Sequence, residues 1–190
     1  IEIGEHILEE SFKTIQEWCK KGIKLQQISI NISMRQLLHQ DFINVVDRLY
    51  NKYIDEKSAI KIIFEITETS TTNDVDNLIY VMNELKKYNI SFSMDDFGTG
   101  YSSLSYLRDL PLSELKIDQS FIAQLSDSKQ AAVVKTIVDI SRNLDLKIVA
   151  EGVEEDYQKE FLKDLDCDIY QGYLYSKPIS KEEFENFCTT

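Results

Sequence analysis

The sequence has few cysteines and few histidines. Its three cysteines, Cys19, Cys167 and Cys188, are an odd number at wide spacing, and none belongs to a CxxC pair. Because only His6 and His39 could complete a metal site with them, the sequence argues against a zinc site and against a disulfide framework. We therefore expect free thiols in a reducing, cytoplasmic compartment.

The sequence also has no long apolar run. No apolar stretch approaches the roughly eighteen residues that a membrane helix needs, and no charged segment followed by an apolar one opens the chain. We expect a soluble polypeptide, and any membrane anchor of the parent protein would lie in upstream segments.

Basic residues are outnumbered. The chain has 21 Lys and Arg against 33 Asp and Glu, which gives a net charge of −12. This balance argues against a DNA or RNA polymer and against an anionic membrane as partner, because counterion release requires basic side chains. A substrate that bears phosphate would need metal ions to offset this field. With 190 residues and 43% hydrophobic content, we expect one domain over residues 1–190.

Apolar β-branched runs alternate with amphipathic segments along the chain. The expected strands are residues 25–32, 60–66, 90–94, 112–117, 146–150 and 169–170. The expected helices are residues 3–21, 34–53, 73–88, 102–109, 128–144 and 155–165, with a last helix after the capping box of Ser180 and Glu183. A strand followed by a helix, six times, predicts an α/β fold with a parallel sheet and helices outside it.

The number of these units points to an incomplete barrel. A (β/α) barrel has eight units in about 250 residues, whereas this chain has six units in 190. Both ratios are about three quarters. The sequence therefore predicts a TIM-like (β/α) barrel with about its first two strands missing from this chain.

Polar residues stand where the expected strands end. They are Asn31, Glu65, Asp95, Asp96, Lys116, Asp118, Glu151, Glu154 and Gln171. Because each crossover returns the chain to the same edge of a parallel sheet, we expect all of them on one side. In (β/α) barrels that side carries the catalytic groups.

The acidic residues among them suggest a metal site. Glu65 interrupts an apolar strand, where a carboxylate is costly to bury unless it is paired or binds metal. Asp95 and Asp96 are adjacent, so on a strand they point to opposite faces, and Asp96 would reach the same site only from the turn after the strand. Oxygen donors without His or Cys favour Mg²⁺ or Mn²⁺, and with Asn31 these residues could begin a two-metal site.

The remaining strand-end residues could act on water. Lys116 would supply positive charge, Glu151 could bind metal through water or accept a proton, and Gln171 could orient the water. Each also has an ordinary explanation: Asn31 as a helix cap, the Asp pair and Glu151 as turn residues, Lys116 as half of a surface ion pair. Together, however, these explanations require several coincidences at equivalent places.

Six segments carry a resemblance to a known family. They are NISMRQL at 31–37, EITE at 65–68, DDFGTGYSS at 95–103, KID at 116–118, EGVE at 151–154 and QGYLYSKP at 171–178. They strongly resemble the EAL-domain family of cyclic di-GMP phosphodiesterases, over nearly the whole chain. The resemblance implies a modified (β/α)₈ barrel that opens cyclic di-GMP to linear pGpG, in second-messenger signalling, with two Mg²⁺ or Mn²⁺ ions.

The resemblance also implies roles for single residues. Asn31, Glu65, Asp95 and Asp96 would be metal ligands, with Asp95 bridging. Lys116, Glu151 and Gln171 would serve the attacking water. Glu68 would hold the loop of residues 96–103, which lies at the dimer interface in this family, and Asp118 and Glu154 would support the site.

One departure from the family leaves alternatives open. The Glu-Ala-Leu motif that names the family, whose Glu is a metal ligand, is absent and is expected on a strand before residue 1. The chain would then be the C-terminal three quarters of an EAL domain, downstream of a sensory or cyclase domain. Besides a phosphodiesterase, it could be a non-catalytic cyclic di-GMP receptor or a dimerising regulatory module.

Overall fold

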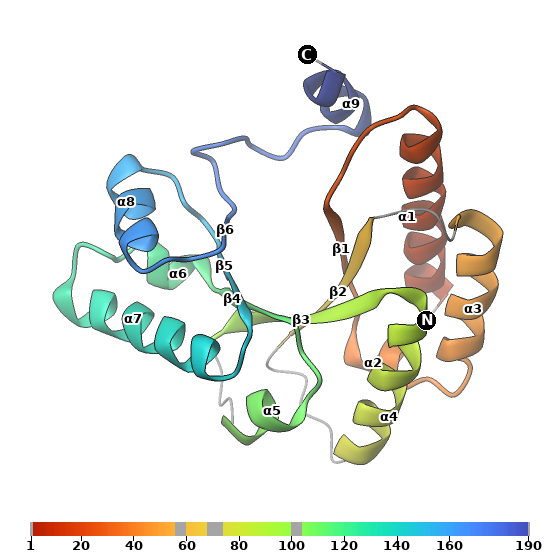
Figure 1. Ribbon diagram of the computed structural model, residues 1–190, viewed down its shortest axis with the longest axis horizontal. Helices are drawn as coiled ribbons and strands as arrows, with labels where there is room; N and C mark the ends of the chain where they lie inside the picture. The colour runs from red at the N-terminus through yellow and green to blue at the C-terminus, as the bar shows by residue number, and fades with distance from the viewer. Residues whose placement is uncertain (1, 56–59, 68–73, 100–103, 190) are drawn as a thin grey trace. The chain divides into compact units, whose positions relative to one another are not determined.

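The computed structural model describes residues 2–55, 60–67, 74–99 and 104–189. Its strands are β1 (Gln27–Asn31), β2 (Lys61–Thr67), β3 (Ile90–Phe97), β4 (Glu114–Ile117), β5 (Lys147–Ala150) and β6 (Ile169–Tyr170). Its helices are α1 (Glu2–Lys20), α2 (Met34–Leu37), α3 (Phe42–Tyr53), α4 (Val75–Leu85), η1 (Lys86–Tyr88), α5 (Leu104–Asp109), α6 (Gln119–Ile122), α7 (Ser128–Asn143), α8 (Asp156–Asp164) and α9 (Lys181–Thr189). Strands and helices alternate as predicted (Figure 1).

The strands form a parallel sheet in the order of the chain, from β1 to β6. Parallel pairing is present between β1 and β2, and between each successive pair from β3 to β6. Strand β4 is buried along its whole length, as expected when helices cover a parallel sheet. The predicted α/β class and the parallel sheet are therefore confirmed.

The chain divides into two compact units. The first unit comprises Ile1–Ile66, Ser70–Phe92 and Ile179–Thr190, and the second comprises Thr67–Thr69 and Ser93–Pro178. Strand β3 thus begins in the first unit and ends in the second. This matters for the site, because Asn31 and Glu65 belong to the first unit and the later strand-end residues to the second.

In the first unit, an aromatic core joins β2, β3 and α3. Phe64 packs against Phe92 with ring centroids 5.9 Å apart and against Phe42 at 6.2 Å. All three rings are buried. Two aromatic side chains on neighbouring strands and one on a helix therefore hold β2 and the start of β3 against α3.

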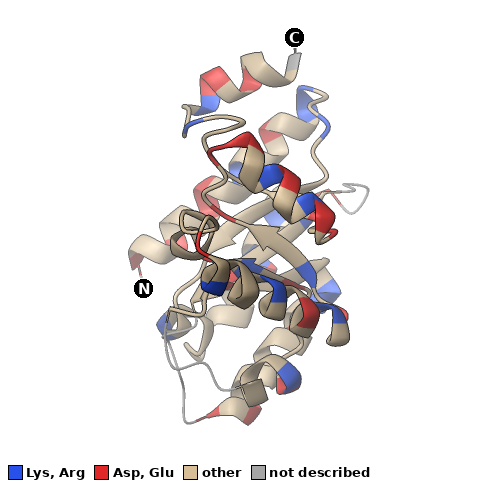
Figure 2. Ribbon diagram, turned by 90° about the vertical axis from the view of Figure 1, so that its left-hand side faces the viewer, with Lys and Arg blue, Asp and Glu red and all other residues tan. Residues whose placement is uncertain are grey.

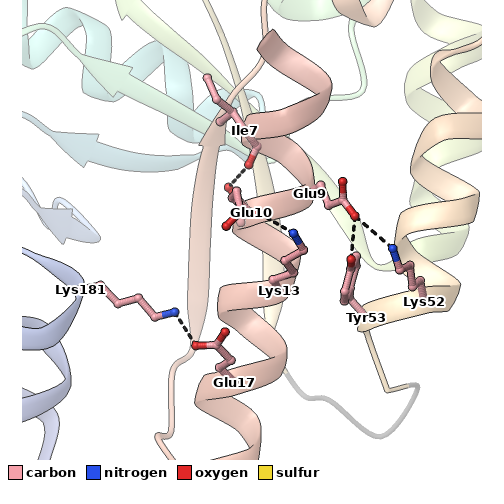
Figure 3. A network of polar contacts seen from close by, with 9 residues as sticks. Ile7, Glu9, Glu10, Lys13, Glu17, Lys52, Tyr53 and Lys181 are labelled. Atoms are coloured by element: carbon pink, nitrogen blue, oxygen red, sulfur yellow. Dashed lines mark hydrogen bonds and ion pairs between the residues drawn. The ribbon is translucent and has the colours of Figure 1, made fainter. Parts of the chain in front are cut away.

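Helices α1 and α3 lie side by side and are joined by polar contacts (Figures 1 and 3). Glu9 accepts hydrogen bonds from the Tyr53 hydroxyl at 2.7 Å and from Lys52 Nζ at 3.1 Å. These bonds, that of Tyr53 first, lower the pKa of Glu9 to about 2. Glu17 of α1 pairs with Lys181 of α9, so α9 is tied to the same helix.

In the second unit, α7 packs against β4 and β5. Val134, Ile137 and Val138 of α7 are buried, and so are Leu115 of β4 and Ile148 of β5. Apolar residues at helical spacing on α7 thus fix the strands whose ends carry Lys116 and Glu151.

The helices carry most of the charge. Lys and Arg residues are interspersed with Asp and Glu residues along them, and many form pairs within one helix or between helices (Figure 2). None of the helices in the described part of the chain combines the length and the apolarity that a membrane crossing requires.

Two expectations about helices were wrong. Residues 34–53 form two helices, because Ser33 caps α2 in a capping box with Gln36 and the chain turns before α3 starts at Phe42. The short helix α6 was not expected at all. Four residues are too few to show a helical period, so only the Asp118 cap could have suggested it.

The three cysteines are free thiols that differ in exposure. Cys167 is buried, whereas Cys19 and Cys188 are exposed. Burial raises the pKa of the Cys167 thiol to about 11, and its Sγ lies 3.5 Å from the carbonyl oxygens of Ile148 and Ile169. Because the thiolate is the reactive form, Cys167 should be nearly inert at pH 8 in the folded protein.

This difference can be measured by labelling with a thiol-specific disulfide reagent at pH 8. We expect the substitution Cys167→Ser to leave the number of thiols that react in the native protein unchanged. The same substitution should remove one thiol from the count after unfolding. A drop of one in the native count would contradict the burial of Cys167.

Candidate functional site

The best-defined site lies in the second unit, where β3, β4 and β5 end. Lys116 of β4 is 4% exposed, and its Nζ lies 2.9 Å from Asp95 Oδ1 and 2.7 Å from Glu151 Oε1. Strand register explains this meeting: Met94 pairs with Leu115, and Ile117 with Ala150, so the next polar residues come together at one edge. An ammonium group therefore lies between two carboxylates at the carboxyl ends of three parallel strands.

Asp96 joins this group through an irregularity in β3. The pairing of β3 with β4 shifts register between Met94 and Phe97, and Asp96 has a left-handed backbone with φ of 53°. Such a bulge breaks the alternation of side chains between the two faces of a strand. The prediction that Asp96 would reach the site from the turn after the strand was therefore wrong, because Asp96 lies within β3.

Asp95, Asp96 and Glu151 form what we call the carboxylate cluster. Each offers one ligand oxygen, and these oxygens all lie within 4.8 Å of one another. Opposite ligands of an octahedral Mg²⁺ ion stand about 4.2 Å apart, since each metal–oxygen bond is about 2.1 Å. The limit of 4.8 Å is slightly above this value, and with its hard oxygen donors the cluster is a candidate site for a divalent cation.

The hydrogen bonds of Asp95 leave one oxygen for such a cation. Its Oδ1 accepts from Lys116 Nζ and, at 3.0 Å, from the backbone N–H of Asp96. Both contacts fall on the same oxygen, so within the described residues Oδ2 is the atom without a protein donor. Asp95 can therefore keep its contacts to the protein and still bind metal.

Asn31 and Glu65 form a second group, in the first unit. They are register partners at the ends of β1 and β2, and the backbone N–H of Ile32 donates to the Glu65 carbonyl at 2.9 Å. Register partners on parallel strands have their side chains on the same face. Glu65 is 7% exposed. The amide of Asn31 and the buried carboxylate of Glu65 are therefore neighbours at the ends of β1 and β2.

Gln171 and Asp118 follow strands β6 and β4, and each takes part in a hydrogen bond that involves the backbone. The N–H of Gln171 donates to the Ala150 carbonyl at 2.8 Å, which places Gln171 beside Glu151 in the register of β6 and β5. Asp118 accepts from the N–H of Ser120 at 2.9 Å and caps α6. The side chain of Asp118 is thus committed to a helix end.

Glu154 is exposed, and its N–H donates to Gln158 Oε1 at 2.8 Å. Glu68 and residues 100–103 of the expected loop lie outside the described residues.

Gln158 is a buried polar residue that sequence reasoning missed. It is 4% exposed, and its Oε1 also accepts from the N–H of Glu155 at 3.0 Å, while its Nε2 donates to the Ile122 carbonyl at 3.1 Å. The signal was weak: Gln158 stands three positions after Glu155, as in a capping box, but Glu is not one of the usual first residues of that motif. Gln158 therefore ties the start of α8 to α6.

The fold and this set of oxygen donors define a parallel α/β domain with a candidate site for divalent cations, and comparison with known proteins identifies its family. The sequence model described as EAL domain matches residues 1–178. The chain therefore belongs to the EAL domain family, as its motifs indicated.

Two curated relatives illustrate the similarity. The chain is 41% identical over 184 residues to the bifunctional diguanylate cyclase/cyclic di-GMP phosphodiesterase MucR of Pseudomonas aeruginosa, which covers 96% of this chain and 27% of that protein. It is 39% identical over 188 residues to the signaling protein YkoW of Bacillus subtilis, covering 98% of this chain and 23% of that protein. The chain spans about a quarter of the length of these relatives.

Solved structures show the same fold. The phosphodiesterase PaMucR in complex with c-di-GMP has a TM-score of 0.87 at 41% identity, with 96% of this chain and 74% of that chain covered. The EAL domain of Mycobacterium smegmatis DcpA has a TM-score of 0.89 at 30% identity, with 96% and 82% covered. The predicted EAL-type fold is confirmed.

Proposed function

We propose that this domain hydrolyses cyclic di-GMP to linear pGpG. One observation carries the proposal: two members of the carboxylate cluster, Asp95 and Glu151, contact the buried Lys116 at the carboxyl ends of β3, β4 and β5, in a chain of the EAL family. Two relatives whose names include cyclic di-GMP phosphodiesterase, MucR and NbdA, are 41% and 43% identical to the matched parts of this chain.

The metal ligands in this proposal come from both groups of residues. Asn31 and Glu65 would join Asp95 and Asp96 in holding two Mg²⁺ or Mn²⁺ ions, with Asp95 shared between them. Bound divalent ions would lower the pKa of a water molecule to near neutrality and offset the charge of the phosphodiester. The chain's net charge of −12 makes such an offset necessary for a substrate with two phosphates.

The other residues would handle the water and its proton. Glu151 would accept a proton from the attacking water, and Lys116, 2.7 Å from it, would keep this carboxylate in place. Gln171 would orient the water by a hydrogen bond. The water oxygen forms a bond to phosphorus while the opposite P–O bond to the ribose breaks, and the released alkoxide takes up a proton. Opening one of the two diester links in this way leaves a linear dinucleotide.

We also propose that the domain acts as a homodimer within a larger cytoplasmic signalling protein. The relatives support the larger protein, because they are several times longer than the matched region and include a bifunctional cyclase and phosphodiesterase and an oxygen sensor protein. Glu68 would support the loop of residues 96–103 at the dimer contact. Asp118 and Glu154 would support the site through the backbone positions described above.

The test is release of pGpG from cyclic di-GMP by the full-length protein with Mn²⁺, followed by chromatography. We expect turnover with the ion, none with EDTA, and none in the variant Glu65→Ala, which removes a proposed ligand. Turnover equal to that of Glu65→Ala would reject the proposal. Calorimetry then separates the alternatives, because a receptor without activity binds the nucleotide in EDTA and a purely dimerising module does not bind it.

A further inference from the structure

Helix α6 follows directly on the strand that carries Lys116. It starts at Gln119, two residues after β4 ends, and the side chain of Asp118 caps it. The single turn therefore has a fixed place relative to Lys116. Two loops of the carboxylate cluster approach it, one after Asp96 and one after Glu151, and all of these residues belong to the second unit.

The first contact is between Phe121 of α6 and the loop after Asp96. Gly98 has a φ of 95°, and a Cβ placed on it would come within 2.7 Å of Phe121 Cζ. The aromatic ring thus fills the space that a side chain at position 98 would occupy. The ring therefore lies directly against the backbone segment that follows Asp96. Glycine is the residue that best allows both this φ and this close approach.

The second contact is between Gln119 of α6 and the loop after Glu151. Gly152 has a φ of 66°, and a Cβ on it would lie 2.5 Å from the Cβ of Gln119. Gly152 follows Glu151 directly, so the position of this backbone sets where the carboxylate of Glu151 starts. The same short helix therefore contacts the backbone that follows Asp96 and the backbone that follows Glu151.

The far end of α6 is anchored as well. Gln158 donates to the carbonyl of Ile122 at 3.1 Å and accepts from the N–H groups of Glu154 and Glu155. Its amide is buried, so these bonds are shielded from competing water. The helix cannot shift without breaking bonds to the segment that follows Glu151.

The cluster needs such a restraint. Its three carboxylates have oxygens within 4.8 Å of one another, and like charges at this separation repel. Lys116 Nζ lies 2.9 Å from Asp95 Oδ1 and 2.7 Å from Glu151 Oε1, so its single positive charge offsets part of this repulsion. A rigid element between the Asp96 loop and the Glu151 loop would keep the oxygens at a spacing that one cation can bridge.

We propose that α6 sets this spacing, with Phe121 and Gln119 as positioning residues for Asp96 and Glu151. From the proposed function, this inference requires that the carboxylate cluster binds a divalent cation. It does not require that the domain hydrolyses cyclic di-GMP. Its readout is the binding of Mn²⁺ itself, measured by calorimetry on the full-length protein in the absence of nucleotide.

The first comparison removes the ring. Phe121→Ala should weaken Mn²⁺ binding about tenfold, the lower end of the effect of residues that orient metal ligands. Phe161→Ala is the matched control, because Phe161 is the same residue in the same unit, is also partly buried, and lies on α8. It should change the dissociation constant by less than about twofold.

The second comparison tests the contact between Gly152 and Gln119 of α6. Gly152→Ala forces a Cβ against Gln119 and should also weaken Mn²⁺ binding about tenfold. Gly22→Ala is its control, because Gly22 has a similar φ of 72° and a Cβ there would meet no atom within 4 Å among the described residues. It carries the backbone strain without the collision and should leave Mn²⁺ binding unchanged. This pair decides the question if Phe121→Ala does not fold.

At saturating Mn²⁺, hydrolysis by Phe121→Ala should return to within severalfold of the unsubstituted protein, whereas Asp96→Asn should stay inactive. Unchanged Mn²⁺ affinity in both Phe121→Ala and Gly152→Ala overturns the inference, and so does an equal loss in the two controls. If the unsubstituted protein binds Mn²⁺ but releases no pGpG, the proposed function fails while the role of α6 stands.

Discussion

Replacing Asp95 by Asn is expected to lower kcat for cyclic di-GMP hydrolysis by about a hundredfold to a thousandfold. Asn has the same shape as Asp, and its oxygen can still accept the hydrogen bond from the N–H of Asp96. The substitution removes the charge of the residue that meets Lys116 and replaces Oδ2, the oxygen left for a cation, by an NH₂ group that cannot bind metal. The loss should therefore appear in the rate and in Mn²⁺ affinity while the fold is retained.

The measurement is pGpG release under single-turnover conditions, with circular dichroism to check folding. Ser93→Ala is the matched control, because Ser93 precedes Asp95 by two residues on the same strand and is fully buried. Its Oγ has no hydrogen-bond partner among the described residues, so Ala should leave the rate unchanged and not destabilise the protein. If Asp95→Asn kept more than a tenth of the activity, Asp95 would not be the central ligand.

Replacing Lys116 by Met is expected to destabilise the protein by about 3 kcal/mol and to stop hydrolysis. The Lys116 side chain is 5% exposed and lies between Asp95 and Glu151, whose side chains are 12% and 16% exposed. Without the ammonium, two mostly buried carboxylates face each other without that counter-charge. A loss of this size lowers the melting temperature by roughly 6–12 °C in a domain of this length.

Added Mn²⁺ should reverse part of this loss. A divalent cation would supply the positive charge that Lys116 no longer gives, so Mn²⁺ should raise the melting temperature of Lys116→Met more than that of the unsubstituted protein. Lys135→Met is the control, because Lys135 is an exposed residue on α7 of the same unit. It removes the same charge and should shift the melting temperature by no more than a few degrees. Equal melting temperatures for Lys116→Met and Lys135→Met would contradict the buried ion pairs.

Much of the site could be predicted because parallel strands carry their polar residues to one edge. Asn31 and Glu65 were expected near each other from their place at successive strand ends, and they are register partners. Lys116 and Glu151 are 35 residues apart, yet the pairing of β4 with β5 brings them to 2.7 Å. These outcomes need only strand ends and connections, which apolar patterns indicate well.

Other features escaped prediction because they depend on single backbone angles or on very short segments. Asp96 was expected to reach the site from the turn after the strand, whereas it joins Asp95 and Glu151 from within β3, where its φ is left-handed. Helix α6 is four residues long, so its role between Gly98 and Gly152 appears only when the distances are known. The exposure of Cys19 and Cys188 likewise depends on which helix faces are covered.

The sequence alone determined the kind of site: hard oxygen donors, one lysine and no thiol or imidazole among them, at the ends of strands in a parallel sheet. Tertiary structure decided which of these groups touch. The ammonium of Lys116 bridges Asp95 and Glu151, and Asp96 turns inward, because strand register and one bulge place atoms to within a few tenths of an ångström, which no pattern of residue types specifies.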